Sequence, residues 1–371
     1  MIKEVKKVTV KYNERIVGYL AEIKPSTIAF QYDDEWIKNG FSISPLSLPL
    51  DNKVYVSKKE QFNGLYGVFW DSLPDGWGEL LMNRVLQKKG INPNQLPILT
   101  KLSLINNNGL GGLTYEPNQS FKSTYNDLDF DKLSDEVKKI LNDESESVDL
   151  DFIYKLGGSS GGARPKAHIK IDDEEWIVKF ACRIDPPNVG VKEFRANETA
   201  MRCGINVNEH KLFPSKLCSG YFGTKRFDRI GERRIHMISL AALLETTHKI
   251  PNLDYMHLFQ VIQIISARPT EDLYEAFRRM CFNVFYKNKD DHGKNFAFIY
   301  DENLCGYVLS PAYDLTRIED KFEHEMTVNG NGNPNKEDMF EVAKKFKLSI
   351  TKCKDIMTQI DKICSSTNNK D

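Results

Sequence analysis

Two nearby stretches constrain the fold of this chain more than any others: NKDDHGKNF, at Asn288–Phe296, and SPAYDLT, at Ser310–Thr316. The first offers an acid at Asp290 and an amide at Asn295 (295 − 290 = 5), and the second adds an acid at Asp314. Carboxylate and amide oxygens are ligands that Mg²⁺ prefers, and a carboxylate can orient an attacking hydroxyl group. The fold must therefore bring a polar loop that follows a helix close to a second loop that follows a strand.

Protein kinases place a base Asp and a metal-holding Asn at this spacing and supply a metal-binding Asp from a later loop. We therefore predict ATP-dependent phosphoryl transfer, with Asp290 preferred to Asp291 as the base on spacing alone. His292 would be a general base or a brace for the loop. Lys294 would neutralise the transferring phosphate or pair with a carboxylate. The alternative is an ordinary polar loop that caps a helix, which the later Asp314 argues against.

Composition limits the class of protein. With 371 residues, 40% of them hydrophobic, the chain can bury a core divided between two or more domains. A formal net charge of −1 gives no general affinity for nucleic acid. We expect no membrane-spanning helix, because no run of about 18 apolar residues occurs. We expect no signal peptide, because the N-terminal residues alternate like a strand and lack an apolar block. Seven scattered cysteines without a C-x-x-C pair favour a reducing cytoplasm over a disulfide framework or metal cluster.

Residues 1–120 are predicted to form a small α+β subdomain. Apolar side chains alternate along Val8–Tyr12, and Ile16–Ile23 is typical of its hairpin partner. A helix is expected to begin after Asp75, a candidate N-cap, and to end before Gly90. The glycine-bearing turn that follows is interpreted as structural.

The remaining chain is predicted to contain an acidic helix and linker, a small lobe that carries nucleotide, a helical catalytic lobe and a frayed tail. Their ranges are 121–150, 151–238, 239–364 and 365–371. The small lobe is expected to run strand, glycine loop, two strands, helix and two strands. KRFDRIGERR, Lys225–Arg234, is interpreted as a solvated hairpin, with a local basic face as the alternative.

GGSSGGARPK, at Gly157–Lys166, is the candidate phosphate loop. Backbone N–H groups that lack flanking side chains can approach phosphates closely, although a flexible hairpin would need the same glycines. The loop does not match the P-loop pattern, since no hydroxyl residue follows its lysine. Ser159 and Ser160 at its tip could contact phosphates or be phosphorylated.

Lys179, in WIVKF, lies on a predicted buried strand, where a charged amine requires an anionic partner. ATP phosphates and an acid of the following helix would provide that partner. Glu198 is the first candidate for this acid and Glu193 the second. The alternative is an edge-strand lysine whose amine reaches solvent.

Together these motifs resemble the HipA family of bacterial serine/threonine kinases, the toxins of toxin–antitoxin pairs. ISPLSLPL and SLPDGWGELLMNR resemble its N-terminal subdomain, and GGSSGGARPK its serine-bearing nucleotide loop. VKF resembles its ATP lysine and KRFDR its hinge, while D-x-H-x-K-N and SPAYDLT resemble its catalytic and metal motifs. The resemblance implies an α+β, bilobed protein-kinase-like fold with a small N-terminal α+β subdomain and a mostly helical C-terminal lobe.

The resemblance also assigns roles to residues. It implies Asp290 as the base, Asn295 and Asp314 on Mg²⁺, and Lys179 on the ATP phosphates. The backbone near Lys225 and Phe227 would meet adenine, with Asp228 towards the ribose. The remaining nucleotide contacts would come from the phosphate loop and the two loops described first: Gly158, Ser159, Ser160, Gly161, Gly162, Lys294 and Tyr313. Ser159 matches the autophosphorylated serine of the family, with Ser160 beside it. Lys225 stands where the family commonly has an acid, so a main-chain contact would survive and a side-chain contact would not.

The implied partners are a protein substrate, which in some family members is an aminoacyl-tRNA synthetase, and a helix-turn-helix antitoxin that would mediate any contact with DNA. The implied setting is growth arrest or persistence. Two other functions stay open, a small-molecule phosphotransferase and a non-catalytic partner of an antitoxin on DNA. A protein-sized substrate groove would favour the protein kinase, and a closed acidic pocket would favour the small-molecule phosphotransferase. Four intact residues argue against the second: Lys179, Asp290, Asn295 and Asp314.

Overall fold

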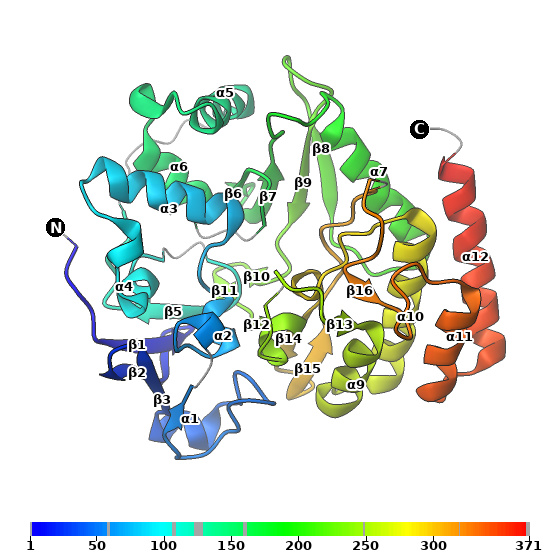
Figure 1. Cartoon of the computed structure of the whole chain (residues 1–371), viewed down its shortest axis with the longest axis horizontal. Coiled ribbons are helices and arrows are strands. Elements are labelled where there is room, and N and C mark those ends of the chain that lie inside the picture. Colours follow the sequence, from blue (N-terminus) through cyan, green and yellow to red (C-terminus); the bar gives the residue numbers. More distant parts are fainter. Residues whose placement is uncertain are drawn as a thin grey trace. The chain divides into compact units, whose positions relative to one another are not determined.

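The computed structural model describes residues 2–57, 60–105, 109–121, 129–158, 162–247, 249–318 and 320–368 (Figure 1). The chain divides into two compact units. Unit 1 comprises Met1–Gly190, Lys211–Ile238 and Ala242–Thr246, and unit 2 comprises Val191–His210, Ser239–Ala241 and Thr247–Asp371. Unit 1 thus holds the predicted N-terminal subdomain together with most of the predicted small lobe, and the predicted domain boundaries stay a prediction.

A five-stranded sheet with the order β4-β3-β2-β1-β5 forms the N-terminal part of unit 1. Its strands are β1 Lys7–Tyr12, β2 Arg15–Lys24, β3 Thr27–Tyr32, β4 Tyr55–Val56 and β5 Leu113–Glu116. β1 pairs with β2 in antiparallel register, and the side chains of Val8, Val10 and Tyr12 are buried. The predicted alternation and its hairpin partner are confirmed.

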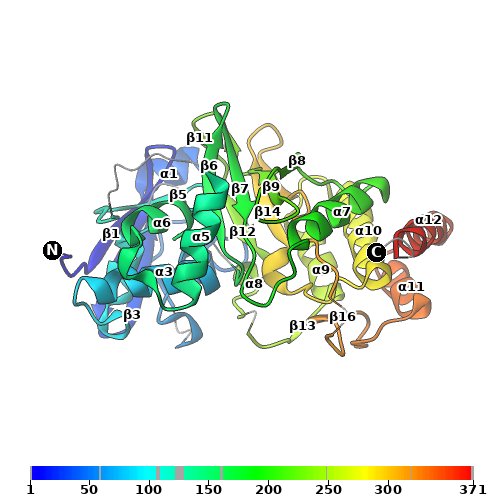
Figure 2. The ribbon, with the colours of Figure 1, turned by 90° about the horizontal axis from the view of Figure 1, so that it is seen from above.

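Helices of unit 1 connect and cover this sheet and the next one. They are α1 Asp34–Asn39, η1 Glu60–Phe62, α2 Gly67–Trp70, α3 Gly76–Lys88, η2 Pro93–Gln95, α4 Ile98–Ser103, α5 Phe130–Leu141, η3 Ser145–Ser147 and α6 Leu150–Gly157. α3 and α6 lie side by side in both views (Figures 1 and 2). Trp77 and Leu81 of α3 share one hydrophobic core with Ile153 of α6 and Val178 of the second sheet. This shared core explains why the N-terminal subdomain and the small lobe form one unit.

The second sheet of unit 1 has the order β6-β7-β9-β8. Its strands are β6 Lys166–Ile171, β7 Glu174–Lys179, β8 His210–Phe213 and β9 Tyr221–Lys225. The hairpin of β10 Arg229–Ile230 and β11 Arg233–Arg234 and the short β12 Met237–Ser239 follow. The four strands predicted after the glycine loop are confirmed.

The strand predicted before the glycine loop is wrong, because that segment is helix α6. Asp149 caps it by accepting a hydrogen bond from the N–H of Phe152 at 3.0 Å. Its buried residues include Leu150, Ile153 and Tyr154, which recur at helical spacing. In so short an apolar run this spacing is easily mistaken for the pattern of a buried strand.

Unit 2 is mostly helical, as predicted. Its elements are most of α7 Val189–Arg202, part of α8 Leu240–Leu243, β13 Leu253–Asp254, α9 Tyr255–Ile265, α10 Pro269–Tyr286, η4 Gly293–Asn295, β14 Ala297–Asp301, β15 Gly306–Leu309, β16 Met326–Thr327, α11 Lys336–Lys345 and α12 Ile350–Asn368. β14 and β15 form an antiparallel hairpin, and α12 packs against α10. No helix among the described residues is long and apolar enough to cross a membrane.

Candidate functional site

The loop between α10 and β14 carries the predicted catalytic residues of unit 2. α10 ends at Tyr286, and its C-cap residue Lys287 has a left-handed conformation with φ of 62°. The N–H of Asn288 then donates to the carbonyl oxygen of Asn283 at 2.9 Å, and its side-chain amide donates to the Asn283 side chain at 3.0 Å. This double contact fixes the point at which the loop leaves the helix.

Asp290 and Asp291 have different environments. The carboxylate of Asp291 is buried and accepts hydrogen bonds from the Tyr255 hydroxyl at 2.8 Å and the Glu325 N–H at 3.0 Å. His324 Nδ1 lies 2.9 Å from the same carboxylate. The side chain of Asp290 is 38% exposed. Asp291 therefore anchors the loop, and Asp290 is the more accessible of the two acids.

Asn295 is oriented by the loop that carries it. Its side-chain Nδ2 donates to the carbonyl oxygen of Asp290 at 2.7 Å. Because the two atoms of the amide point in different directions, this contact turns Oδ1 away and leaves it as the available ligand atom. An oxygen presented in this way suits Mg²⁺.

The segment that carries Asp314 is tied to the same loop. The hydroxyl of Tyr313 donates to the carbonyl oxygen of Lys294 at 2.5 Å. Asp314 itself is half-buried and has a left-handed backbone with φ of 54°, a conformation that is uncommon outside glycine and frequent at functional sites. A pocket behind the two segments is lined in part by Asp291, Asn295 and Tyr313. The two motifs that are separated in sequence therefore meet, as predicted.

His292 and Lys294 are both half-buried. The carbonyl oxygen of His292 accepts the N–H of Asn295 at 2.8 Å, which closes the single turn η4. Among the described residues, no group of three or more His, Cys, Asp or Glu side chains could hold a metal ion. A metal at Asn295 and Asp314 would thus take its other ligands from phosphates and water, which is usual for Mg²⁺.

In unit 1, two lysines face each other where β6 begins and β7 ends. Lys179 is half-buried and pairs in register with Lys166, which is buried. Residues directly opposite each other on neighbouring strands project from the same face of the sheet. A phosphate contact of these two lysines stays a prediction. Sequence reasoning missed Lys166, because only the strand register reveals its position opposite Lys179.

The two acids considered as partners of Lys179 lie on α7. Oε1 of Glu198 is 2.8 Å from Nε2 of His210, and the side chain of Glu193 is buried. A partner for Lys179 on this helix stays a prediction.

The described ends of the glycine loop are held by neighbouring elements. The N–H of Gly158 donates to the carbonyl oxygen of Tyr154 at 2.7 Å, and the N–H of Gly162 donates to Oδ1 of Asp75. The N–H of Trp77 in turn donates to the carbonyl oxygen of Gly162 at 3.0 Å. Asp75 stands at the N-cap position of α3 as predicted, but its side chain clasps the loop instead of capping the helix.

The tip of the loop, Ser159, Ser160 and Gly161, lies outside the described residues. Gly158 and Gly162, on either side of this tip, have their N–H groups already paired. Phosphate contacts through backbone N–H groups would therefore fall to the tip, and this role stays a prediction.

Replacing Gly76 by Ala is expected to lower the free energy of unfolding of unit 1. The loss should exceed the cost of a left-handed backbone alone, which is about 1–3 kcal/mol for a residue other than glycine. Gly76 has φ of +47°, and a Cβ there would lie 2.5 Å from the carbonyl oxygen of Gly162. Gly90→Ala is the matched control, since Gly90 has φ of +73° and nothing within 4 Å of a Cβ. Urea denaturation should give a clearly larger loss for Gly76→Ala. Equal losses would show that the contact with the loop contributes nothing.

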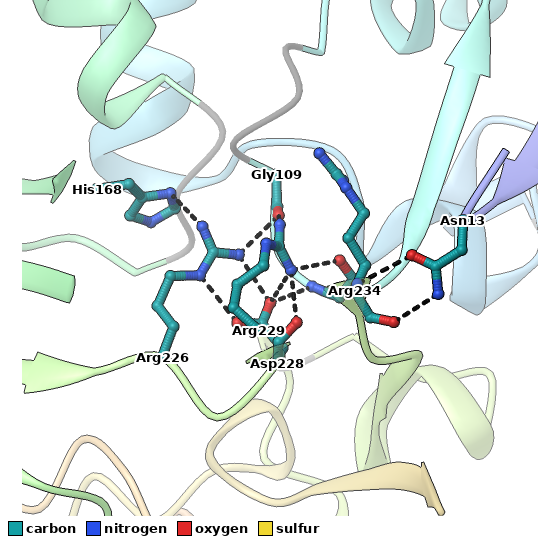
Figure 3. A network of polar contacts seen from close by, with 8 residues as sticks. Asn13, Gly109, His168, Arg226, Asp228, Arg229 and Arg234 are labelled. Atoms are coloured by element: carbon teal, nitrogen blue, oxygen red, sulfur yellow. Dashed lines mark hydrogen bonds and ion pairs between the residues drawn. The ribbon is translucent and has the colours of Figure 1, made fainter. Parts of the chain in front are cut away.

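The predicted hinge is a buried polar network (Figure 3). The carboxylate of Asp228 accepts from Arg226 Nη2 at 2.7 Å, from Arg229 Nη1 at 3.0 Å and from the N–H of Gly111 at 2.6 Å. Both arginines also donate to the carbonyl oxygen of Gly109, at 2.8 and 2.6 Å. The interpretation of this segment as solvated is wrong for Arg226 and Arg229, whose side chains are 1% and 7% exposed.

This network connects the hinge to the N-terminal subdomain. The side chain of Asn13, in the turn between β1 and β2, makes two 2.9 Å hydrogen bonds with the backbone of Arg234 (Figure 3). Burial alone would raise the pKa of Asp228, but Arg226 and Arg229 outweigh it and hold the pKa well below its usual value. A carboxylate with these donors is a structural ion pair. The carboxylate of Asp228 is thus already engaged within the protein, and a contact of Asp228 with the ribose stays a prediction.

Two other hinge residues lie next to this network. The ammonium group of Lys225 pairs with Glu174 on the neighbouring strand β7, and Phe227 is half-buried. The side chain of Lys225 thus faces the sheet, which is compatible with only its main chain meeting a nucleotide.

Family models match most of the chain. The model of the HipA N-terminal domain matches residues 8–116, and the model of the HipA-like C-terminal domain matches residues 158–367, more than half of the chain. The chain belongs to the HipA family. The predicted resemblance is confirmed, and the motifs that carried it lie within the two matched regions, apart from Gly157 at the start of the glycine loop.

Two similar proteins extend this finding. The chain is 23% identical over 341 residues to the proposed kinase Y4mE of Sinorhizobium fredii, spanning 84% of this chain and 77% of that protein. It is also similar to a solved chain of the toxin–antitoxin complex of HipA, HipB and operator DNA from Shewanella oneidensis MR-1, with a TM-score of 0.71. That match has 19% identity and covers 96% of this chain and 88% of the other, so it shows a shared HipA fold. The mixed α and β prediction is confirmed at this level.

Proposed function

We propose that this HipA-family protein is an ATP- and Mg²⁺-dependent serine/threonine protein kinase. The observation that carries the proposal is the orientation of Asn295, whose Nδ2 donates to the carbonyl oxygen of Asp290 at 2.7 Å. One short loop thereby combines an accessible acid with an amide oxygen free to bind a metal. The hydrogen bond from Tyr313 to Lys294 ties a neighbouring segment to this loop, and that segment carries a second acid, Asp314.

Each residue has a defined task in phosphoryl transfer. Asp290 accepts the proton of the substrate hydroxyl as its oxygen bonds to the γ-phosphorus of ATP, while the bond from phosphorus to the bridging oxygen breaks and ADP leaves. Asn295 and Asp314 would hold Mg²⁺, which would neutralise charge on the phosphates. Lys179 and Lys166 contact the phosphates. Their pairing in register across β6 and β7 places both side chains on one face of the sheet.

The serines of the glycine loop suit self-regulation. We propose that Ser159 or Ser160 is autophosphorylated, as the resemblance implies. A phosphoserine adds nearly two negative charges to a segment that must bind phosphates, so modification would inhibit nucleotide binding. The hydrogen bond from the N–H of Gly162 to Asp75 holds the described end of the loop that carries these serines.

The partners follow from the family. The solved relative is a complex with HipB and operator DNA, and we propose that this chain is likewise controlled by a helix-turn-helix antitoxin. Contact with DNA would be indirect, through the antitoxin. Its substrate would be a protein, and growth arrest would be the outcome of its activity.

Asp314→Asn is expected to weaken the Mg²⁺-dependent part of ATP binding by at least about tenfold, since one oxygen ligand loses its charge. Binding without Mg²⁺ should be unchanged. Titration calorimetry with and without Mg²⁺ measures both values. Asp355→Asn, on the exposed face of α12, is the control that should match the wild type. An unchanged Mg²⁺ effect in Asp314→Asn would remove Asp314 from the metal site.

A further inference from the structure

The Lys321 segment, residues 321–325, is held along the catalytic loop of unit 2. Three consecutive loop residues contact it. Lys289 Nζ donates to the carbonyl oxygen of Lys321 at 2.7 Å, and Asp290 pairs with the Lys321 side chain. Asp291 accepts the N–H of Glu325 at 3.0 Å and lies 2.9 Å from the His324 ring. The backbone of the segment is therefore held at Lys321 itself and at Glu325.

The ammonium group of Lys321 lies between two carboxylates. Nζ is 2.6 Å from Oδ1 of Asp290 and 2.7 Å from Oε1 of Glu325. Burial tends to lower the pKa of Lys321, but the hydrogen bonds to Asp290 and Glu325 outweigh burial and raise it. The lysine is thus a permanent cation at the acid that the proposed function uses as its base.

A surface ion pair of this length would ordinarily contribute little, because two flexible side chains must be ordered to form it. Two observations separate Lys321 from that case. Its side chain is only 34% exposed, and the Lys289 and Asp291 contacts order its backbone independently of the ion pair. These backbone contacts therefore offset most of the entropy cost of ordering Lys321, independently of its ion pair with Asp290.

We propose that Lys321 is a positioning residue for phosphoryl transfer, which holds one carboxylate oxygen of Asp290 so that the other faces the substrate hydroxyl. The inference rests on the proposed function of this site. Oδ1 is occupied by the ammonium group, so Oδ2 is the atom that receives the proton. Lys321 itself gives up no proton and forms no bond to phosphorus. Glu325 keeps the ammonium group in place as the charge on Asp290 changes during proton transfer.

The fixed orientation should affect the chemical step more than nucleotide binding. A carboxylate that is free to rotate spends less time in the reactive geometry, which lowers kcat. The KM for ATP should be unaffected, because Lys321 acts on the acid that meets the substrate hydroxyl. This split separates a positioning role from a purely structural one.

The test compares Lys321→Met and Lys321→Arg with the wild type, using autophosphorylation in Mg²⁺ and γ-labelled ATP. Lys321→Met should lower kcat by about 10- to 100-fold with an unchanged KM for ATP, and Lys321→Arg should recover most of the rate. Lys344→Met is the matched control, because Lys344 also makes a 2.6 Å ion pair, with Glu341 on α11, and should have wild-type kinetics.

The possible failures are distinguishable. Wild-type protein that binds ATP but transfers no phosphate would overturn both the proposed function and this inference. An active wild type with an equally active Lys321→Met would overturn the inference alone. The inference is also overturned if thermal denaturation shows that Lys321→Met unfolds at a much lower temperature and Lys321→Arg fails to restore kcat.

Discussion

Asp228→Asn is expected to lower the free energy of unfolding of unit 1 by about 3–5 kcal/mol, the usual effect of removing one partner from a buried ion pair. The substitution keeps the shape of the side chain but leaves Arg226 and Arg229 without their shared anion. It also weakens the connection to Gly111 of the N-terminal subdomain. Denaturation by urea, followed by tryptophan fluorescence, measures the loss.

Two controls make this prediction specific. Asp151→Asn removes an acid that pairs with Lys89 at 2.9 Å on the surface, and it should cost no more than about 1 kcal/mol. The low pKa of Asp228 means that its stabilisation is present above the unfolded-state value, about 3.9, and is lost as the pH falls toward the folded-state pKa. The gap between wild type and Asp228→Asn should therefore narrow below about pH 4. If Asp228→Asn weakens ATP binding and leaves stability intact, the ribose contact is correct and the structural interpretation is wrong.

Asp290→Asn and Asp291→Asn are expected to impair different properties: the rate of phosphoryl transfer in the first and the stability of the fold in the second. Asp290→Asn should lower the rate of phosphoryl transfer by about 10²- to 10⁴-fold, because a general base is lost, and should leave stability close to that of the wild type. Asp291→Asn should lower the free energy of unfolding by about 1–3 kcal/mol, because the contacts with Tyr255, His324 and Glu325 lose a buried anion. Any remaining folded Asp291→Asn protein should keep Asp290 as its base.

Autophosphorylation rates and thermal denaturation of the two variants separate these roles. The reverse pattern, with a stable but inactive Asp291→Asn and an active Asp290→Asn, would assign the base to Asp291. Equal losses of rate and stability in both variants would indicate that the loop simply unfolds when either acid is changed.

Local patterns in the sequence predict much of the fold. Alternation predicts β1, and helical spacing with its end signals predicts α3, α7 and α10. The loop of Asp290 and Asn295 is predictable because its residues are only five positions apart, so one turn of chain brings them together. α6 is missed because its eight residues are too few for the helical period to stand out.

Contacts between distant segments are not predictable in this way. Lys166 faces Lys179 only through the register of β6 and β7, and Lys321 meets Asp290 across 31 positions of the sequence. The two buried arginines of the hinge reach Gly109 across more than a hundred residues. A single sequence shows the charge of such residues, but their partners depend on how the elements pack. For this reason the sequence predicts a solvated hinge, whereas much of the hinge is a buried network.

The central claim is most directly tested by locating phosphate on the protein after incubation with Mg²⁺ and γ-labelled ATP. Wild-type protein, first shown by mass spectrometry to carry no phosphate, should gain label on Ser159 or Ser160, and Asp290→Asn should gain none. That result would establish a serine kinase that uses this loop as its active site. Wild-type protein that binds ATP and stays unlabelled, or label that is equal in Asp290→Asn, would contradict it.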